Sequence, residues 1–219
     1  TAGYLIGPGV DLTGADLTGV DLTGADLTGA DLTGATLTAV TSGSIVGAPT
    51  LSTEYQITDG YLIGPGVDLR LSDLAGADFT GLDLTGADLR GSNLTGADLT
   101  NADLSGANLR STNLSNADLT NANLYNINVS LINLSGATLT GVKSGDLLNY
   151  DNPSFLPTLP SGYRIIAGYL IGLGVDLTGA DLTGLDLTGA DLTGADLTGA
   201  TLTAVTSGSI VGTPTLPSG

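Results

Sequence analysis

The chain of 219 residues contains no Cys, His, Met or Trp and only two Phe. Without Cys and His it lacks disulfides, thiolate nucleophiles, a Ser-His-Asp triad and the usual ligands of zinc, haem and iron–sulfur clusters. Basic residues are scarce as well, because five Lys and Arg stand against 22 Asp and Glu, for a net charge of −17. Nucleic-acid phosphate is therefore excluded as a partner, since its binding requires clustered Lys and Arg.

Long apolar runs are also missing, and none approaches the roughly 18 residues that a membrane span requires. Gly, in contrast, occurs 34 times, and 41% of the residues are hydrophobic, mainly Leu and Ala. This hydrophobic content is too high for a disordered acidic tail. The composition therefore indicates a folded, strongly acidic chain with an unusual internal pattern.

A five-residue repeat accounts for most of the chain. In residues 25–29 it reads A-D-L-T-G, with Leu at its centre and a small residue two positions earlier. Such pentads follow one another in three blocks, residues 10–39, 67–141 and 175–204. A period of five fits neither an α-helix nor a simple strand alternation. Gly in nearly every pentad of the outer blocks would also cost a helix about 1 kcal/mol each.

A longer repeat is superimposed on the pentads. Residues 3–51 and 168–216 differ at only three of 49 positions, and G-Y-L-I-G begins at Gly3, Gly60 and Gly168. We interpret this as a cassette of 57 residues, made of six pentads and a connector, whose middle copy is extended. Such repetition predicts that residues 1–219 form one continuous solenoid, a segment of a longer array.

The tandem A-(D/N)-L-x-x units, such as A-D-L-R-G at 87–91 and A-D-L-T-N at 117–121, resemble those of the pentapeptide-repeat family. The resemblance implies an all-β fold, a right-handed quadrilateral parallel β-helix with four pentads, about 20 residues, in each coil. In every pentad we expect the central Leu and the small residue two positions before it to face inward. The Asp or Asn between them, and the two residues after Leu, should face outward.

The connectors, residues 40–66 and 142–174, are expected to continue the solenoid as distorted coils. Val40 and Ile45 keep the five-residue spacing at the inward position. Gly64-Pro65-Gly66 is predicted to form a corner, and the insertion near 149–154 an outside loop.

A coil of 20 residues would place residues 20 apart in one column on the outer wall. Three such columns stand out: Arg70, Arg90 and Arg110 beside Asp68, Asp88 and Asn108; Asp78, Asp98 and Asp118; and Thr80, Thr100, Thr120 and Thr140. Lys143 falls outside the arginine column. Each column is explained by a solvated, charge-balanced wall. As functional alternatives, the arginine column would be a docking stripe for an acidic partner, and the aspartate column would bind divalent cations weakly. The threonine column would bind ice.

The carboxylates repeat so regularly that no spot is distinguished as a catalytic centre. We therefore predict no enzyme activity, no catalytic, cofactor-binding or metal-binding residues, and no cofactor. The sequence favours a non-catalytic structural or spacer rod, part of a repetitive cell-surface or fibre-forming protein that stacks head to tail. Its expected partners are neighbouring cassettes or copies of itself, and its expected location is extracellular, with the cytoplasm left open.

Two alternative functions stay open. The resemblance implies an acidic mimic of DNA that binds DNA gyrase, as some members of the family do. Those members end in a helix-capped, dimerising terminus, whereas this chain ends in L-P-S-G at 216–219. The other alternative is recognition of ice, mineral or carbohydrate through the threonine and aspartate columns.

Overall fold

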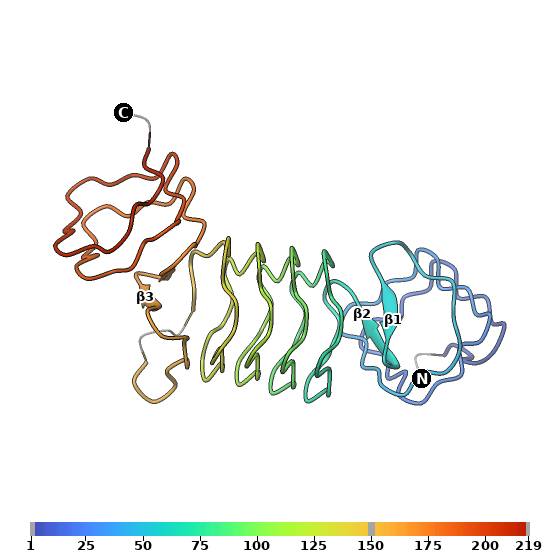
Figure 1. Cartoon of the computed structure of the whole chain (residues 1–219). Coiled ribbons are helices and arrows are strands. Elements are labelled where there is room, and N and C mark those ends of the chain that lie inside the picture. The colour runs from blue at the N-terminus through green and yellow to red at the C-terminus, as the bar shows by residue number, and fades with distance from the viewer. Residues whose placement is uncertain (1–2, 149–151, 218–219) are drawn as a thin grey trace.

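The computed structural model describes residues 3–148 and 152–217, which wind into a series of stacked coils (Figure 1). The central coils are seen edge-on in Figure 1, whereas the coils near both ends are seen from a more open side. The direction of stacking therefore changes twice along the chain. Both changes lie at the connectors, beside the labelled strands.

Successive coils are joined by parallel backbone pairing between residues 20 apart. In the central block Asp68 pairs with Asp88, and Asp88 pairs with Asn108. The N–H of Asp88 donates to the carbonyl of Val67 (2.9 Å), and the N–H of Leu69 donates to the carbonyl of Asp88 (2.8 Å). Each pentad contributes one paired residue and then turns, so the coils consist of isolated bridges rather than long strands.

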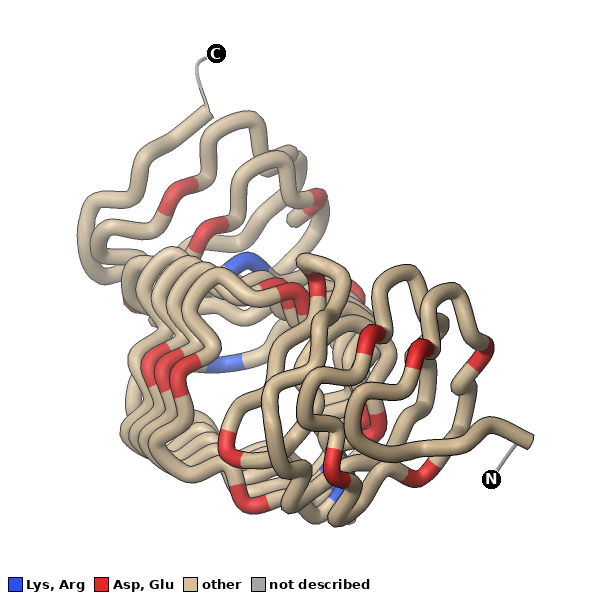
Figure 2. The backbone as a smooth tube through the Cα atoms, turned by 90° about the vertical axis from the view of Figure 1, so that its right-hand side faces the viewer, with Lys and Arg blue, Asp and Glu red and all other residues tan. Residues whose placement is uncertain are grey.

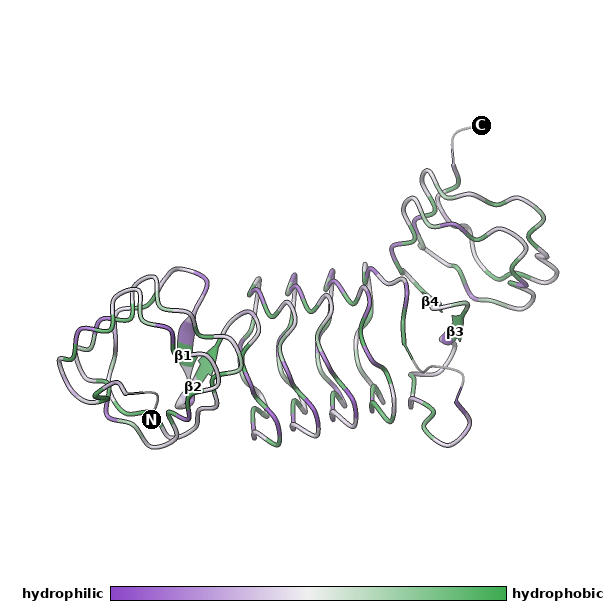
Figure 3. Cartoon of the chain, turned by 180° about the vertical axis from the view of Figure 1, so that it is seen from behind, coloured by the Kyte–Doolittle hydropathy of each residue, from purple (hydrophilic) through white to green (hydrophobic). Residues whose placement is uncertain are grey.

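The inside–outside assignment of the pentad is confirmed. The central residue is buried in all pentads of the first two blocks, including Phe79 and Val129, and Leu202 in the third block is half-buried. Leu104 and Ala102 are 0% and 1% exposed. Figure 3 shows the resulting recurrence of hydrophobic and hydrophilic positions along each coil. Since full burial of a Leu side chain contributes about 2 kcal/mol, the leucine interior supplies the main drive to fold.

The fifth position of the pentad explains the abundance of Gly. This residue adopts a left-handed conformation, with φ of 67° at Gly86 and 60° at Asn101. Gly and Asn enter this region most easily. Leu71 and Leu131 stand at the same position with φ of 59° and 57°, and the Leu71 side chain is highly exposed.

The connectors contain a feature that the sequence analysis did not predict. Strands β1 (Gln56–Thr58) and β2 (Tyr61–Ile63) form an antiparallel hairpin, and so do β3 (Arg164–Ile166) and β4 (Tyr169–Ile171). Both hairpins turn through two residues of positive φ, which is the type I′ pattern favoured between twisted strands. These residues are Asp59 and Gly60 in the first hairpin and Ala167 and Gly168 in the second.

Both connectors attach to the preceding coil in the same way. The N–H of Leu62 donates to the Ser42 hydroxyl (2.8 Å), and that of Leu170 donates to the Ser144 hydroxyl (2.9 Å). One parallel bridge crosses each junction, Thr41 to Asp68 in the first and Lys143 to Asp176 in the second. We call these the first and second junctions.

Two local predictions for the connectors can be compared with the structure. Gly64, Pro65 and Gly66 form a turn, as expected, directly after β2. Of the predicted outside loop at 149–154, residues 149–151 lie outside the described residues, and 152–154 are exposed.

The buried leucine column gives a first test. Leu104→Asp would place a carboxylate among apolar side chains, which costs on the order of several kcal/mol. We expect this variant to lose cooperative folding, measured by circular dichroism during urea titration. Thr100→Ser on the outer wall serves as the control and should keep the wild-type midpoint. Equal tolerance of both changes would contradict the inside–outside assignment.

The left-handed leucine gives a second test. Leu71→Asn should raise the free energy of unfolding by up to about 1 kcal/mol, because Asn tolerates positive φ better than Leu does. Introduction of Leu at an equivalent open position, Gly76→Leu, should lower the free energy of unfolding. Thermal melting monitored by circular dichroism measures both, and a destabilised Leu71→Asn would show that the exposed side chain contributes contacts of its own.

Candidate functional site

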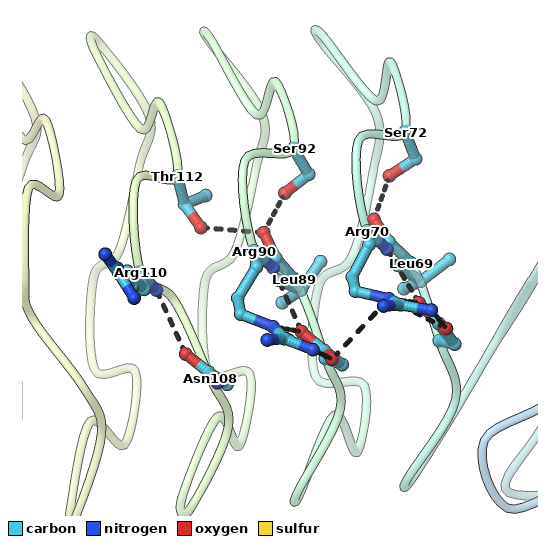
Figure 4. A network of polar contacts seen from close by, with 11 residues as sticks. Leu69, Arg70, Ser72, Leu89, Arg90, Ser92, Asn108, Arg110 and Thr112 are labelled. Carbon is cyan, nitrogen blue, oxygen red and sulfur yellow. Dashed lines mark hydrogen bonds and ion pairs between the residues drawn. The ribbon is translucent and has the colours of Figure 1, made fainter.

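The arginine column is present as predicted, and it is closely paired with carboxylates (Figure 4). Nη2 of Arg70 lies 2.5 Å from Oδ2 of Asp68, and Nη2 of Arg90 lies 2.5 Å from Oδ2 of Asp88. Nε of Arg70 also lies 3.7 Å from Oδ2 of Asp88 on the next coil. The hydrogen bond from Arg70, opposed by partial burial, holds the pKa of Asp68 below its usual value.

Arg110, at the end of this column, has a different environment. Its backbone N–H donates to Oδ1 of Asn108 (3.3 Å), and its guanidinium lies 5.5 Å from the ring centroid of Phe155. This distance fits a cation–π contact. Two of the three arginines are thus neutralised by carboxylates, which favours a charge-balanced wall over a docking stripe for an acidic partner.

A short polar column lies just inside the arginines, where most pentads carry Ala. The side chains of Ser72, Ser92 and Thr112 are buried. The hydroxyls of Ser92 and Thr112 both donate to the carbonyl of Leu89, at 2.7 and 2.8 Å (Figure 4). Their hydrogen bonds offset the cost of burying them, so the column is explained by structure alone.

The aspartate column of Asp78, Asp98 and Asp118 is also aligned by parallel bridges. Each carboxylate accepts the N–H of the residue two positions later, as from Thr80 to Asp78 at 3.0 Å. Within residues 3–148 and 152–217 no group of three or more acidic side chains could hold a metal ion. The carboxylates thus serve the local turns.

The same turn recurs in most pentads, and hydrogen bonds from the residue two positions later lower the pKa of the carboxyl group. The effect is found in all three blocks, at Asp11, Asp16, Asp21, Asp26, Asp78, Asp98, Asp181, Asp186, Asp191 and Asp196. Figure 2 shows Asp and Glu distributed around the coils rather than gathered on one side. This distribution does not single out an acidic site.

The threonine column is aligned, because the N–H of Gly81 donates to the carbonyl of Thr100 and that of Asn101 to the carbonyl of Thr120. Its hydroxyls are not all free, however. Oγ1 of Thr120 donates to Oδ1 of Asp118 at 2.6 Å. Engagement of this hydroxyl within its own pentad weakens the case for a flat ice-binding array.

A groove at the second junction is the feature that the sequence analysis missed. It encloses about 550 Å³ and is lined by residues of both adjoining stacks, among them Asn123, Tyr125, Lys143, Tyr169 and Asp176. Nζ of Lys143 lies 3.6 Å from Oδ2 of Asp176. We call this cavity the junction groove.

Two signals in the sequence mark the groove. Lys143 is the only Lys of the chain, and Tyr125 replaces the usual Thr or Ser after the central Leu124. Neither signal predicts a site by itself, because the groove also requires Tyr169, near the end of the second connector, and Asp176, which lies beyond that connector.

No helix of the described residues is long and apolar enough to cross a membrane.

The profile of the family Pentapeptide, described as pentapeptide repeats, matches eight copies of the repeat in this chain. The matched residues are 9–41, 65–91, 92–130, 112–143 and 174–206, which together cover more than half of the chain. The chain therefore belongs to the pentapeptide-repeat family, whose members are β-helical solenoids. No curated protein sequence matches the chain.

Several solved structures are similar to it. HetL, a pentapeptide repeat protein involved in heterocyst differentiation regulation from the cyanobacterium Nostoc sp. strain PCC 7120, is 30% identical, with 96% of this chain and 90% of that chain covered and a TM-score of 0.39. The pentapeptide repeat protein alr5209 from Nostoc PCC 7120 is 41% identical over 35% of this chain and 63% of that one (TM-score 0.34). QnrB1, a plasmid-mediated fluoroquinolone resistance protein, is 18% identical over 91% of this chain and 89% of that chain, with a TM-score of 0.32. At these TM-scores the similarity assigns no function.

The ion pair of Asp68 and Arg70 yields a pH prediction. Because the pKa of Asp68 is lower in the folded state than in the unfolded state, its stabilisation is present above about pH 4 and is lost as the pH falls below that. Arg70→Gln should raise the pKa of Asp68, measured by NMR titration of the carboxyl carbon.

The same variant should lose less stability than the wild type between pH 7 and pH 3, by at most about 1 kcal/mol because Arg70 is half-exposed. Arg164→Gln is the control, since Arg164 donates to the carbonyl of Thr188 instead. An unchanged pKa of Asp68 in Arg70→Gln would contradict the assigned cause.

Proposed function

We propose that this chain is a right-handed quadrilateral β-helix with four pentads per coil, and that it serves as a non-catalytic structural rod. The observation that carries the proposal is the unbroken ladder of parallel bridges. From Asp68 it passes through Asp88 and Asn108 to Asn128 and Leu148, always at a spacing of 20 residues. Three further ladders begin one, two and three pentads later, as expected for four faces.

The chemistry of the wall supports a structural role. Its carboxylates close local turns, and its column of arginines is largely paired with them. Among the described residues, every buried side-chain nitrogen and oxygen has a hydrogen-bond partner. The coils therefore present a repetitive scaffold with its buried polar groups paired, rather than unpaired groups of the kind that catalysis uses.

The two junctions provide a template for joining cassettes end to end. Residues 3–9 repeat residues 60–66, and residues 205–216 repeat 40–51 with one change. In the first junction the counterparts of these segments contact each other through Leu62. We propose that the same contact joins neighbouring cassettes, within one chain or between two copies.

The exposure of one leucine supports this template. Leu5 is 78% exposed, whereas Leu62, its counterpart in the first junction, is 1% exposed. In the proposed contact the N–H of Leu5 donates to the hydroxyl of Ser207 in the preceding unit, as Leu62 does to Ser42. Repetition of such units would give a fibre, which we place at the cell surface or outside the cell.

Deletion of one whole coil tests the rod. Removal of residues 87–106 joins Gly86 to Ala107 and keeps the pentad phase. We expect cooperative unfolding to persist and the particle to shorten by about 4.8 Å, the spacing of paired strands. Small-angle X-ray scattering measures the length. Removal of 87–104 is the matched control, and it should lower stability because the pentad phase is broken.

Self-association tests the end-to-end contact. The 219-residue chain should form longer particles as its concentration rises, seen by analytical ultracentrifugation and electron microscopy. Leu5→Asp should abolish this growth, and Thr13→Asp on the outer wall should not. Growth that survives Leu5→Asp would overturn the proposed contact, and potent inhibition of DNA gyrase supercoiling by the purified chain would overturn the structural role.

A further inference from the structure

The junction groove lies where the central stack meets the next one. Its floor is a continuous ladder, because Asp103 pairs with Asn123, Asn123 with Lys143, and Lys143 with Asp176. The groove is contiguous with a second hollow of about 420 Å³, which shares Asn123, Lys143 and Asp176 and adds Asn101. Backbone pairing holds the floor in place, so the groove exists before any ligand binds.

Two tyrosines form the apolar wall of the groove. Their rings converge on Gly145, where an added Cβ would lie 2.8 Å from Cε2 of Tyr125 and 3.4 Å from Cε1 of Tyr169. A side chain at this position would displace the Tyr125 ring, so Gly145 lets that ring lie against the backbone. The hydroxyl of Tyr125 donates to the carboxylate of Asp146, which fixes the ring and raises the pKa of Tyr125. Tyr125 nevertheless remains 49% exposed.

The floor of the groove presents polar groups of both kinds, hydrogen-bond donors and acceptors. The side-chain amide of Asn123 donates to Oδ1 of Asp103 (3.1 Å), and its oxygen accepts the N–H of Tyr125 (3.1 Å). The Lys143 side chain is 64% exposed, and its ammonium group has one carboxylate, Asp176, at 3.6 Å. An ammonium group has three donors, so others remain for a ligand.

These groups together select the chemistry of the ligand. An anion would meet the carboxylates of Asp103 and Asp176, and a cation would meet Lys143. A neutral ligand with many hydroxyls avoids both conflicts, because ammonium and amide groups donate to hydroxyl oxygens and carboxylates accept from hydroxyl hydrogens. A tyrosine ring offers a flat apolar face together with a polar edge. We propose that the junction groove binds a neutral oligosaccharide, with one sugar ring against Tyr125 and its hydroxyls bonded to Lys143, Asn123 and Asp176.

The first junction provides an internal comparison. It keeps a tyrosine, Tyr61, at the position of Tyr169, but Thr23 replaces Tyr125 and Thr41 replaces Lys143. Arg70 there occupies the position of Thr178 and pairs with Asp68. The cavity at the first junction is lined by Arg70, Leu71 and Arg90 and contains no tyrosine. The site is therefore specific to the extended middle copy and is separate from the threonine and aspartate columns.

Binding is tested on the full chain with defined probes. Cellohexaose, laminarihexaose and chitohexaose are titrated separately, with isothermal calorimetry and NMR shifts as readouts. We expect at least one to bind with a Kd of about 1 mM and to shift signals of residues in the groove. Tyr125→Ala and Lys143→Ala should each weaken binding about tenfold. Tyr61→Ala at the first junction is the matched control and should leave the affinity unchanged.

Circular dichroism and melting temperature establish that each variant is folded. If Tyr125→Ala does not fold, Lys143→Ala alone tests the proposal. Three results would overturn the proposal. These are no binding of any probe up to about 20 mM, binding that both groove variants retain at full strength, and tighter binding of tetramethylammonium or sulfate than of every oligosaccharide.

Discussion

Backbone pairing between residues 20 apart is the constraint on which the rest of this structure depends. A single coil buries only a few leucines, and ordering its backbone costs on the order of 1 kcal/mol or more per residue. Pairing with the coils on both sides adds backbone hydrogen bonds and continues the leucine interior. The bonds on either side of Asp88 show how each coil depends on its neighbours. Stability therefore belongs to the stack rather than to any one coil.

The regular part of the molecule was predictable because it repeats. The period of five identified the inward leucines, and the period of 20 placed Arg70, Arg90 and Arg110 in one column. The two hairpins were not predicted, although Asp59-Gly60 is a known turn signal, because the five-residue spacing continues into the connectors and favours distorted coils there. The second hairpin has Ala167 in place of Asp59, so its turn carries a weaker signal.

The junction groove was not predictable for a different reason. Tyr125 belongs to the central pentad block and Lys143 to the start of the second connector, whereas Tyr169 and Asp176 lie beyond the insertion near 149–154. Their proximity depends on how the connector returns to the stack, which no local pattern describes. A repetitive wall makes every coil chemically alike, so distinct chemistry arises where the repetition is interrupted.

The central block meets its two neighbours along different ladders. The bridge from Thr41 enters at Asp68, whereas the bridge to Asp176 leaves from the ladder that starts at Asp83, three pentads further along the first coil. The number of pentads between two connectors thus determines the direction in which the next stack of coils leaves the central one. Duplication or loss of a single pentad would move the start of the next stack to a neighbouring face of the coil, without altering any contact inside the connectors. Changes in the number of pentads within a block are therefore sufficient to change the angles between successive stacks of an assembled fibre.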